Sequence, residues 1–218
     1  MKVKLIQHTK DADKICALAA LGCHEQKAAF ELEEDITLSS IEHILRYTIS
    51  KGHESVIEHA SFTFSIKGVS RSLSHQLVRH RIASFSQQSQ RFVKMEEPEF
   101  VTPHTIAENK AIVDKYEKIM EQIWSVYNEF IKEGIPVEDA RFVLPNACKT
   151  NIVVTMNARE LHHFFELRCC EKAQWEIREL AREMLKLVKK VAPLIFEKAG
   201  PDCLNCPEKD PKCQRKHI

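Results

Sequence analysis

Alternation between apolar and polar residues predicts the strands of this chain. The segment 61–67 alternates strictly and places two phenylalanines and an isoleucine on one face, as in a strand with one buried side. Alternation over 1–7 and the β-branched residues of 151–156 predict two further strands. Because these strands are short and few, we expect a small mixed or antiparallel sheet.

Apolar residues that recur every three or four positions predict helices between the strands. The predicted helices span 11–21, 38–51, 109–133 and 172–198, and Pro136 stands where a further helix can begin. Asn157 and Glu160 have the spacing of a capping box, which predicts a helix directly after the strand 151–156. Long helices flanking a small sheet predict an α+β fold. We expect one domain over 1–200 and a cysteine-rich tail over 201–218.

Composition narrows the functional classes. The chain has 218 residues, enough to bury a full core, and a formal net charge of +1, so its overall charge does not favour a nucleic-acid partner. No apolar run approaches the roughly 20 residues of a membrane span, and the first residues lack a signal-peptide pattern. We therefore expect a cytoplasmic protein without a membrane partner. Only five glycines are present, too few and too scattered for a GxGxxG or P-loop motif.

The segment 59–95 contains no Asp or Glu, although acidic residues make up 31 of the 218. At that frequency about five acids are expected in a segment of this length. The segment also carries six Lys and Arg residues and a dense run of hydroxyl and amide side chains at 84–90. Guanidinium groups beside such donors suit recognition of phosphate and carbonyl groups. A solvated basic face and a nucleic-acid patch are the alternatives. The segment has few aromatic residues that could stack on bases, Phe85 and Phe92 being the nearest, which weakens the nucleic-acid interpretation.

The order of residues in this segment is more informative than its composition. RHRIASFSQQS (79–89), followed by Arg91, closely resembles the signature of flavin-dependent thymidylate synthases, in which Arg-His-Arg is followed by seven residues and Ser. Further blocks resemble the same family in the same order: HESVIEHASFTF (53–64), EDARFVLPNA (138–147) and MNARELHHFFELRCC (156–170). The resemblance extends from about residue 38 to residue 198.

The resemblance implies an activity, its cofactors and an assembly. The implied reaction is the reductive methylation of dUMP to dTMP, with methylenetetrahydrofolate as one-carbon donor. Reduced FAD, recharged by NADPH, is the implied hydride donor, and the implied assembly is a homotetramer with active sites shared between subunits. Such a reaction needs no enzyme nucleophile. Consistent with this, no cysteine lies in 59–95, and Cys148, Cys169 and Cys170 are predicted to pack in the core.

The resemblance also assigns roles to individual residues. The implied flavin-binding residues are Ser55, Arg79, His80, Arg81, Gln87, Asn157, Arg159 and His163. The implied dUMP-binding residues are Gln76, Arg79, Gln88, Ser89, Gln90, Arg91, Arg141 and Arg168. Among them Arg168 is the implied catalytic residue, which polarises the uracil ring. Without the resemblance, Arg141 as a cap of its own helix and Arg168 as a favourable charge at a helix C-terminus are the alternatives.

The chain departs from the family pattern at three positions. Gln87 stands where Glu is common, Phe92 stands where Tyr is frequent, and His163 stands where Asn is often found. The departures concern individual hydrogen bonds and leave the implied reaction unchanged.

The tail carries a separate pattern. Cys203, Cys206, Cys213 and His217 have the spacing of a structural zinc site, and a tail of unliganded thiols is the alternative. A second functional hypothesis combines this zinc knuckle with the basic segment 59–95 in a nucleic-acid-binding module. The two functions predict different observations: a yellow flavoprotein, or a colourless protein that binds oligonucleotides with a steep salt dependence.

Overall fold

The computed structural model describes residues 1–201, 203, 206 and 213. Its strands are β1 (Lys2–His8), β2 (Ser61–Ser70), β3 (Ala83–Gln87) and β4 (Lys149–Asn157). The α-helices are α1 (Ala12–Gly22), α2 (Ala29–Leu32), α3 (Leu38–Ser50), α4 (Arg71–Leu77), α5 (His104–Ala107), α6 (Lys110–Lys132), α7 (Val137–Ala140), α8 (Ala158–Arg168) and α9 (Trp175–Val191). Short 3-10 helices are η1 (Glu54–His59) and η2 (Arg141–Val143). None of the helices in this part of the chain has the length and apolar character needed to cross a membrane.

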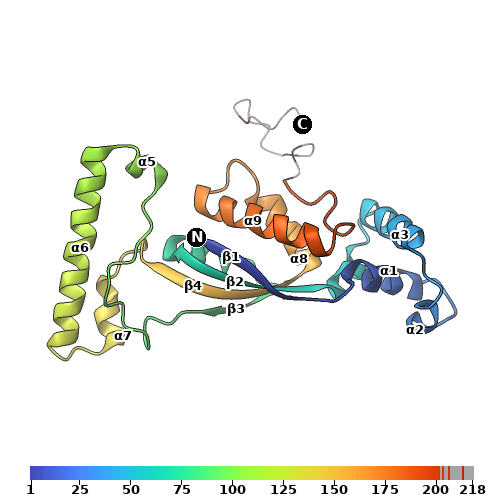
Figure 1. Ribbon diagram of the computed structural model, residues 1–218, viewed down its shortest axis with the longest axis horizontal. Coiled ribbons are helices and arrows are strands. Elements are labelled where there is room, and N and C mark those ends of the chain that lie inside the picture. The colour runs from blue at the N-terminus through green and yellow to red at the C-terminus, as the bar shows by residue number, and fades with distance from the viewer. Residues whose placement is uncertain (202, 204–205, 207–212, 214–218) are drawn as a thin grey trace. The chain divides into compact units, whose positions relative to one another are not determined.

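The strands form one sheet with the order β1-β2-β4-β3 (Figure 1). Thr63 Oγ1 lies 3.0 Å from Thr155 Oγ1, and the backbone N–H of Gly68 donates to Asn151 Oδ1 at 3.2 Å. Residue numbers therefore rise along β2 as they fall along β4, so these central strands are antiparallel. The predicted α+β class and small sheet are confirmed.

The chain divides into two compact units whose boundaries fall within the strands. Unit 1 comprises Met1–Lys2, Ile66–Arg79 and Ser86–Ile152. Unit 2 comprises Val3–Ser65, His80–Phe85 and the described residues of Val153–Ile218. The predicted single domain over 1–200, with its boundary at the tail, stays a prediction.

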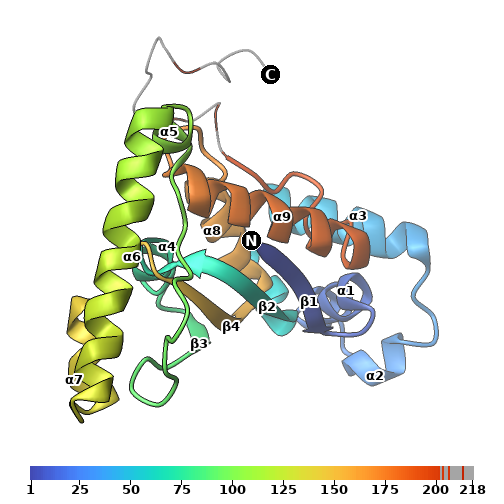
Figure 2. The same ribbon diagram turned by 60° about the vertical axis from the view of Figure 1, so that its left-hand side comes forward.

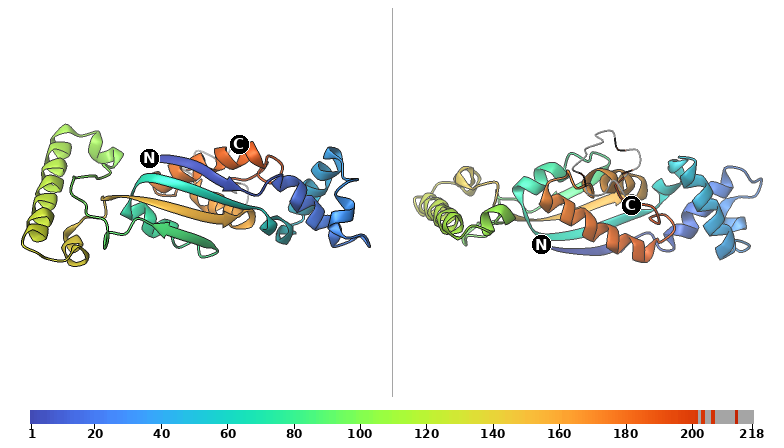
Figure 3. Two further views of the ribbon diagram at one scale, coloured as in Figure 1. Left: turned by 60° about the horizontal axis from the view of Figure 1, so that its bottom comes forward. Right: turned by 90° about the horizontal axis from the view of Figure 1, so that it is seen from above.

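The core of unit 2 contains several buried aromatic side chains. Phe62 of β2 and Phe165 of α8 are fully buried, and each makes an edge-to-face contact with Phe196, at ring-centroid distances of 5.3 and 6.0 Å. Helices α8 and α9 pack against each other over one face of the sheet in this unit (Figure 3). The strand predicted over 61–67 is confirmed, and its apolar face packs against these helices.

Unit 1 has a smaller core beneath the long helix α6, which α7 accompanies near its C-terminal end (Figure 2). Trp124 and Tyr127 of α6 are almost fully buried, together with Met95 and Cys148. The Tyr127 hydroxyl also accepts a hydrogen bond from the backbone N–H of Met95 at 3.2 Å. This bond ties the extended segment after β3 to the helix.

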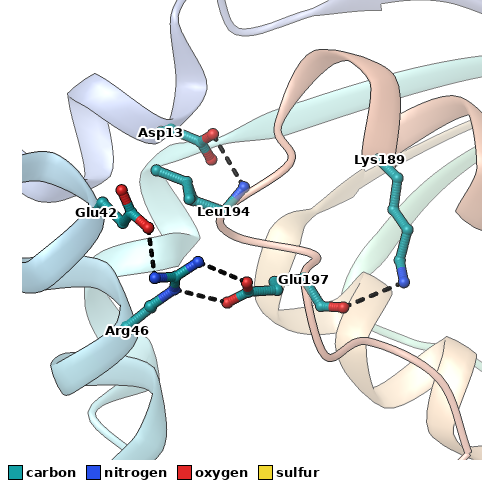
Figure 4. A network of polar contacts seen from close by, with 6 residues as sticks. All are labelled: Asp13, Glu42, Arg46, Lys189, Leu194 and Glu197. Atoms are coloured by element: carbon teal, nitrogen blue, oxygen red, sulfur yellow. Dashed lines mark hydrogen bonds and ion pairs between the residues drawn. The ribbon is translucent and has the colours of Figure 1, made fainter. Parts of the chain in front are cut away.

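A polar network in unit 2 holds the segment that follows α9 (Figure 4). Asp13 accepts hydrogen bonds from the backbone N–H groups of Leu194 and Ile195, at 3.1 and 3.0 Å. Arg46 of α3 donates two hydrogen bonds to the Glu197 carboxylate, at 3.0 and 2.8 Å, and also pairs with Glu42. Residues just beyond Glu197 line a cavity of unit 2, so the network fixes part of that cavity's wall.

Several predicted boundaries need correction. The last helix spans Trp175–Val191 and not 172–198: Gln174 caps its start by accepting from two backbone N–H groups, and Pro193 disfavours helix at the residue before it. Asn157 caps α8 as predicted, but the Glu160 carboxylate bonds to a histidine instead of completing a capping box. The sequence pattern also missed α4 and β3, both short and poor in regular apolar spacing.

Candidate active site

A buried polar contact of unit 2 joins two predicted blocks of the sequence. His80 follows α4, while Glu160 and Arg168 lie in the first and last turns of α8. The His80 Nδ1 atom lies 3.0 Å from Glu160 Oε1, and Arg168 Nε donates to His80 Nε2 at 3.1 Å. His80 and Glu160 are only 4% and 6% exposed. The three side chains therefore form a continuous chain of hydrogen bonds.

Burial controls the charges in this chain of hydrogen bonds. Burial, with the nearby positive charge of Arg168 and with His163, lowers the pKa of His80 to about 4. Burial also raises the pKa of Glu160 and lowers that of Arg168. A guanidinium stays protonated in proteins in spite of such a shift. At neutral pH His80 is therefore neutral and Arg168 carries its positive charge.

A cavity of about 590 Å³ lies beside these residues in unit 2. Asn157, Arg159 and His163, three of the predicted flavin-binding residues, line it, and so does Glu160. The exposed Arg159 guanidinium pairs with Glu58 at 2.5 Å and with Glu54 at 3.5 Å across the cavity rim. The structure thus brings together residues that α8 and η1 contribute.

Polar side chains gather in unit 1 between β3 and β4. Gln87 Nε2 donates to Ser74 Oγ at 2.9 Å and to Thr150 Oγ1 at 3.2 Å. Gln88 accepts from the Asn151 side chain at 3.1 Å, and its backbone N–H donates to the Asn151 carbonyl at 2.8 Å. These bonds fix the start of the run Gln88, Ser89 and Gln90, which is half-buried.

Two predicted dUMP-binding arginines meet at Glu138 of unit 1. Arg91 pairs with the Glu138 carboxylate at 3.0 Å. Arg141 Nε donates to the Glu138 backbone carbonyl at 3.0 Å, which is the helix-capping contact foreseen as its alternative role. Arg71, which was not among the predicted residues, donates a hydrogen bond to the Gln88 carbonyl at 3.1 Å and lies near Arg141. The buried Nε atom of Arg71 has no hydrogen-bond partner. Three guanidinium groups are therefore held close to the polar run.

The remaining predicted residues lie apart from these groups. Arg79 and Arg81 are exposed and flank the buried His80, and Gln76 is half-buried at the end of α4. Ser55 lines a different cavity of unit 2, formed with residues of α1 and α3. The structure does not bring Ser55 to the cavity of Asn157.

The units separate the two predicted binding sets. The dUMP set lies in unit 1 except for Arg168, and the flavin set lies in unit 2 except for Gln87 and Arg79, the latter being shared by both sets. Each unit thus gathers most of the residues of one predicted ligand.

The zinc prediction finds no support. In the described part of the chain, no group of three or more His, Cys, Asp or Glu side chains is placed to hold a metal ion. Cys203, Cys206 and Cys213 belong to that part, whereas His217 lies outside the described residues. The core prediction for cysteines holds better: Cys148 and Cys169 are buried, and Cys170 is half-buried.

Comparison with known proteins relates this arrangement to a family. The family model described as "Thymidylate synthase complementing protein" matches residues 4–194. The chain belongs to this family. Flavin-dependent thymidylate synthase of Geobacter sulfurreducens is 53% identical over 217 residues, which cover 98% of this chain and 94% of that protein. The enzyme of the same name from Pyrococcus furiosus is 45% identical, with 99% and 94% covered.

A solved structure shares the fold. The crystal structure of the UMP/dUMP methylase PolB from Streptomyces cacaoi, bound with 5-Br dUMP, matches with a TM-score of 0.80 and 25% identity. The match covers 90% of this chain and 93% of that chain. The family resemblance drawn from the sequence blocks is confirmed, and the nucleic-acid-binding alternative gains no support from the comparisons.

Sequence reasoning missed Glu160, Ile82 and Arg71. Glu160 was explained by local capping, which concealed its contact with His80. Ile82 lines the cavity of unit 2 with 68% of its surface exposed, and its place directly after the Arg-His-Arg motif is the signal that could have indicated it. Arg71 belongs to the acid-free segment and could have been included on charge alone.

Proposed function

We propose that this chain catalyses the reductive methylation of dUMP to dTMP, with methylenetetrahydrofolate as one-carbon donor and NADPH as reductant. The observation that carries the proposal is the match to relatives named flavin-dependent thymidylate synthase over nearly the whole chain. The fold neighbour bound to a dUMP analogue supports the choice of nucleotide. FAD, reduced by NADPH, would supply the hydride when it is bound.

The residues around the unit 2 cavity fit a flavin. The cavity's volume of about 590 Å³ lies within the range of small-molecule sites. Asn157, Arg159 and His163 offer polar contacts, and the exposed Ile82 offers an apolar surface for a planar ring. Arg79 and Arg81 are solvent-exposed cations suited to the diphosphate. These residues would hold FAD.

The residues of unit 1 fit the nucleotide. Arg91 and Arg141 would bind the phosphate, in exchange for their contacts with Glu138. Gln76, Gln88, Ser89 and Gln90 would bind the base and sugar through amide and hydroxyl groups. The family resemblance gives Arg168 the role of stabilising the negative charge that develops as the uracil ring is activated.

We expect neither Cys148 nor Ser89 to act as a nucleophile. Burial raises the pKa of the Cys148 thiol, which leaves it protonated at neutral pH, and its sulfur accepts a hydrogen bond from Gln90. Ser89 accepts a hydrogen bond from the backbone N–H of Arg91 at 3.2 Å. The side chains next to Ser89 in the sequence are amides and a guanidinium, and none of them is a base that could take its proton. Ser89 therefore acts in binding.

The proposed homotetramer is supported by an exposed apolar stripe on α6. Ile112, Ile119, Val126 and Phe130 are each between 36% and 47% exposed. Tyr116 and Ile123 continue the spacing but are partly buried against the core of unit 1. The spacing alternates between four and three residues, as in helices that pack along a seam. The stripe reads the same in both directions, so a second copy of α6 can lie antiparallel on it.

We expect Ile119→Lys to lower the mass of the protein in solution. The added charge would be buried in the antiparallel contact, which is costly without a partner. The measurement is light scattering after size exclusion, with the wild type at about four times the chain mass of 25.2 kDa. Glu121→Lys, which changes charge on the same helix away from the stripe, is the control. An unchanged mass for Ile119→Lys would exclude this face from the assembly.

The proposed function is tested with purified protein. We expect about one FAD per chain by absorbance, and dTMP formation that requires dUMP, methylenetetrahydrofolate and NADPH together. The double variant Arg79→Ala with Arg81→Ala should lose FAD and keep its helical content, because both cations are exposed and support no core contact. A folded wild-type protein, reconstituted with FAD, that forms no dTMP would refute the proposed function. Full flavin retention in the double variant would refute the placement of the cofactor.

A further inference from the structure

We propose that His80 and Glu160 are positioning residues that fix the direction of the Arg168 guanidinium for the reaction. This inference rests on the proposed function, in which Arg168 stabilises charge on the uracil ring. It gives His80 a role different from the flavin contact that the family resemblance implies. It also gives a role to Glu160, which the sequence pattern explained as part of a capping box.

The hydrogen bonds allow only one arrangement of protons. A guanidinium has N–H donors and no acceptor, so His80 Nε2 must accept from Arg168 Nε at 3.1 Å. A neutral imidazole whose Nε2 accepts carries its proton on Nδ1. That proton is donated to Glu160 Oε1, which accepts it at 3.0 Å. Both ring nitrogens of His80 are thus used within the chain, and none is left to donate to a cofactor.

The surroundings of His80 keep this arrangement in place. Phe164 packs edge-to-face on its ring at a centroid distance of 4.9 Å, and the His163 ring lies at 5.8 Å. The charged groups that face the imidazole are Arg168 on one side and the Glu160 carboxylate on the other. Burial, Arg168 and His163 all oppose protonation, so the imidazole stays neutral and the bond from Arg168 persists across the working pH range.

Fixing the Nε atom of Arg168 restricts a side chain that otherwise rotates about several bonds. The Nε bond sets the plane of the guanidinium, and the terminal nitrogens, which no described carboxylate pairs with, remain for the substrate. Glu160 acts one step further away, because its charge selects the His80 tautomer that can accept. The same logic governs histidines whose second nitrogen is oriented by a carboxylate.

The kinetic test compares variants that keep or remove the acceptor. His80→Leu should lower kcat by about 10- to 100-fold, because small displacements of a charged group are costly, and should change the KM for dUMP much less. His80→Gln, which retains an acceptor for Arg168, should recover most of kcat. The double variant His80→Leu with Glu160→Leu leaves no buried carboxylate unpaired, so we expect it to fold. Its kcat should fall as far as that of His80→Leu. Glu183→Gln, on the exposed side of α9, is the control.

A second test observes the proton directly. Nitrogen NMR of the FAD-loaded protein, with the His80 signals assigned through His80→Gln, should show the Nδ1–H tautomer and no protonation between pH 5 and 8. Glu160→Gln should weaken that tautomer preference and lower kcat. An Nε2–H tautomer, a His80 that protonates near pH 6.5, or full kcat in the double leucine variant would each overturn the proposal. Absence of dTMP formation by the wild type would instead refute the proposed function and leave the NMR test valid.

Discussion

Arg168→Ala is expected to lower turnover at saturating dUMP by about a hundredfold or more while FAD stays bound. Removing one preorganised donor from a developing oxyanion commonly costs about 2.7–4 kcal/mol, which corresponds to a loss of that size. Arg168 is half-buried at the end of α8 and keeps its charge in spite of burial. The measurement is the steady-state rate of dTMP formation, together with the FAD absorbance of the purified variant.

Two further variants make this result specific. Arg168→Lys keeps the charge but loses the planar fork and its Nε, so it should recover little of the lost rate. Lys186→Ala removes an exposed cation of α9 and should leave the rate unchanged. A rate for Arg168→Ala close to that of the wild type would remove Arg168 from the mechanism, and a covalent adduct between Ser89 and the nucleotide would replace the mechanism altogether.

Arg91→Ala is expected to raise the KM for dUMP by about ten- to a hundredfold with a small change in kcat. A charge-assisted hydrogen bond contributes roughly 1.5–3 kcal/mol, and the phosphate lies far from the reacting carbon, so the loss affects ground state and transition state alike. The measurement is the dependence of the initial rate on dUMP concentration.

The ion pair between Arg91 and Glu138 provides an internal contrast. Glu138→Gln removes the carboxylate that competes with the phosphate for Arg91, so its KM for dUMP should stay the same or fall. Lys132→Ala, at the exposed end of α6 in the same unit, is the neutral control. An unchanged KM for Arg91→Ala, or a higher KM for Glu138→Gln than for the wild type, would contradict the phosphate role of Arg91.

Local patterns in the sequence determine much of this protein. Strict alternation defines β2 because successive side chains point to opposite faces of a sheet, and the apolar face must be covered. Asn157 caps α8 because its side chain reaches a backbone N–H three residues ahead, a contact that needs no other part of the chain. The motif at 79–89 and its companion blocks identify the family, since their order and spacing are properties of the sequence alone.

Only the tertiary structure decided which of these residues meet. His80 contacts Glu160 and Arg168 across 80 and 88 positions of the chain, and no local pattern specifies contacts at such separations. Glu160 satisfies the spacing of a capping box, yet its carboxylate turns to His80 because a buried imidazole N–H needs an acceptor more than a partly solvated helix end does. The sequence by itself therefore determined β1, β2, β4, the Asn157 cap and the family. Packing decided the partners and charges of the buried groups, since both depend on which side chains exclude water from one another.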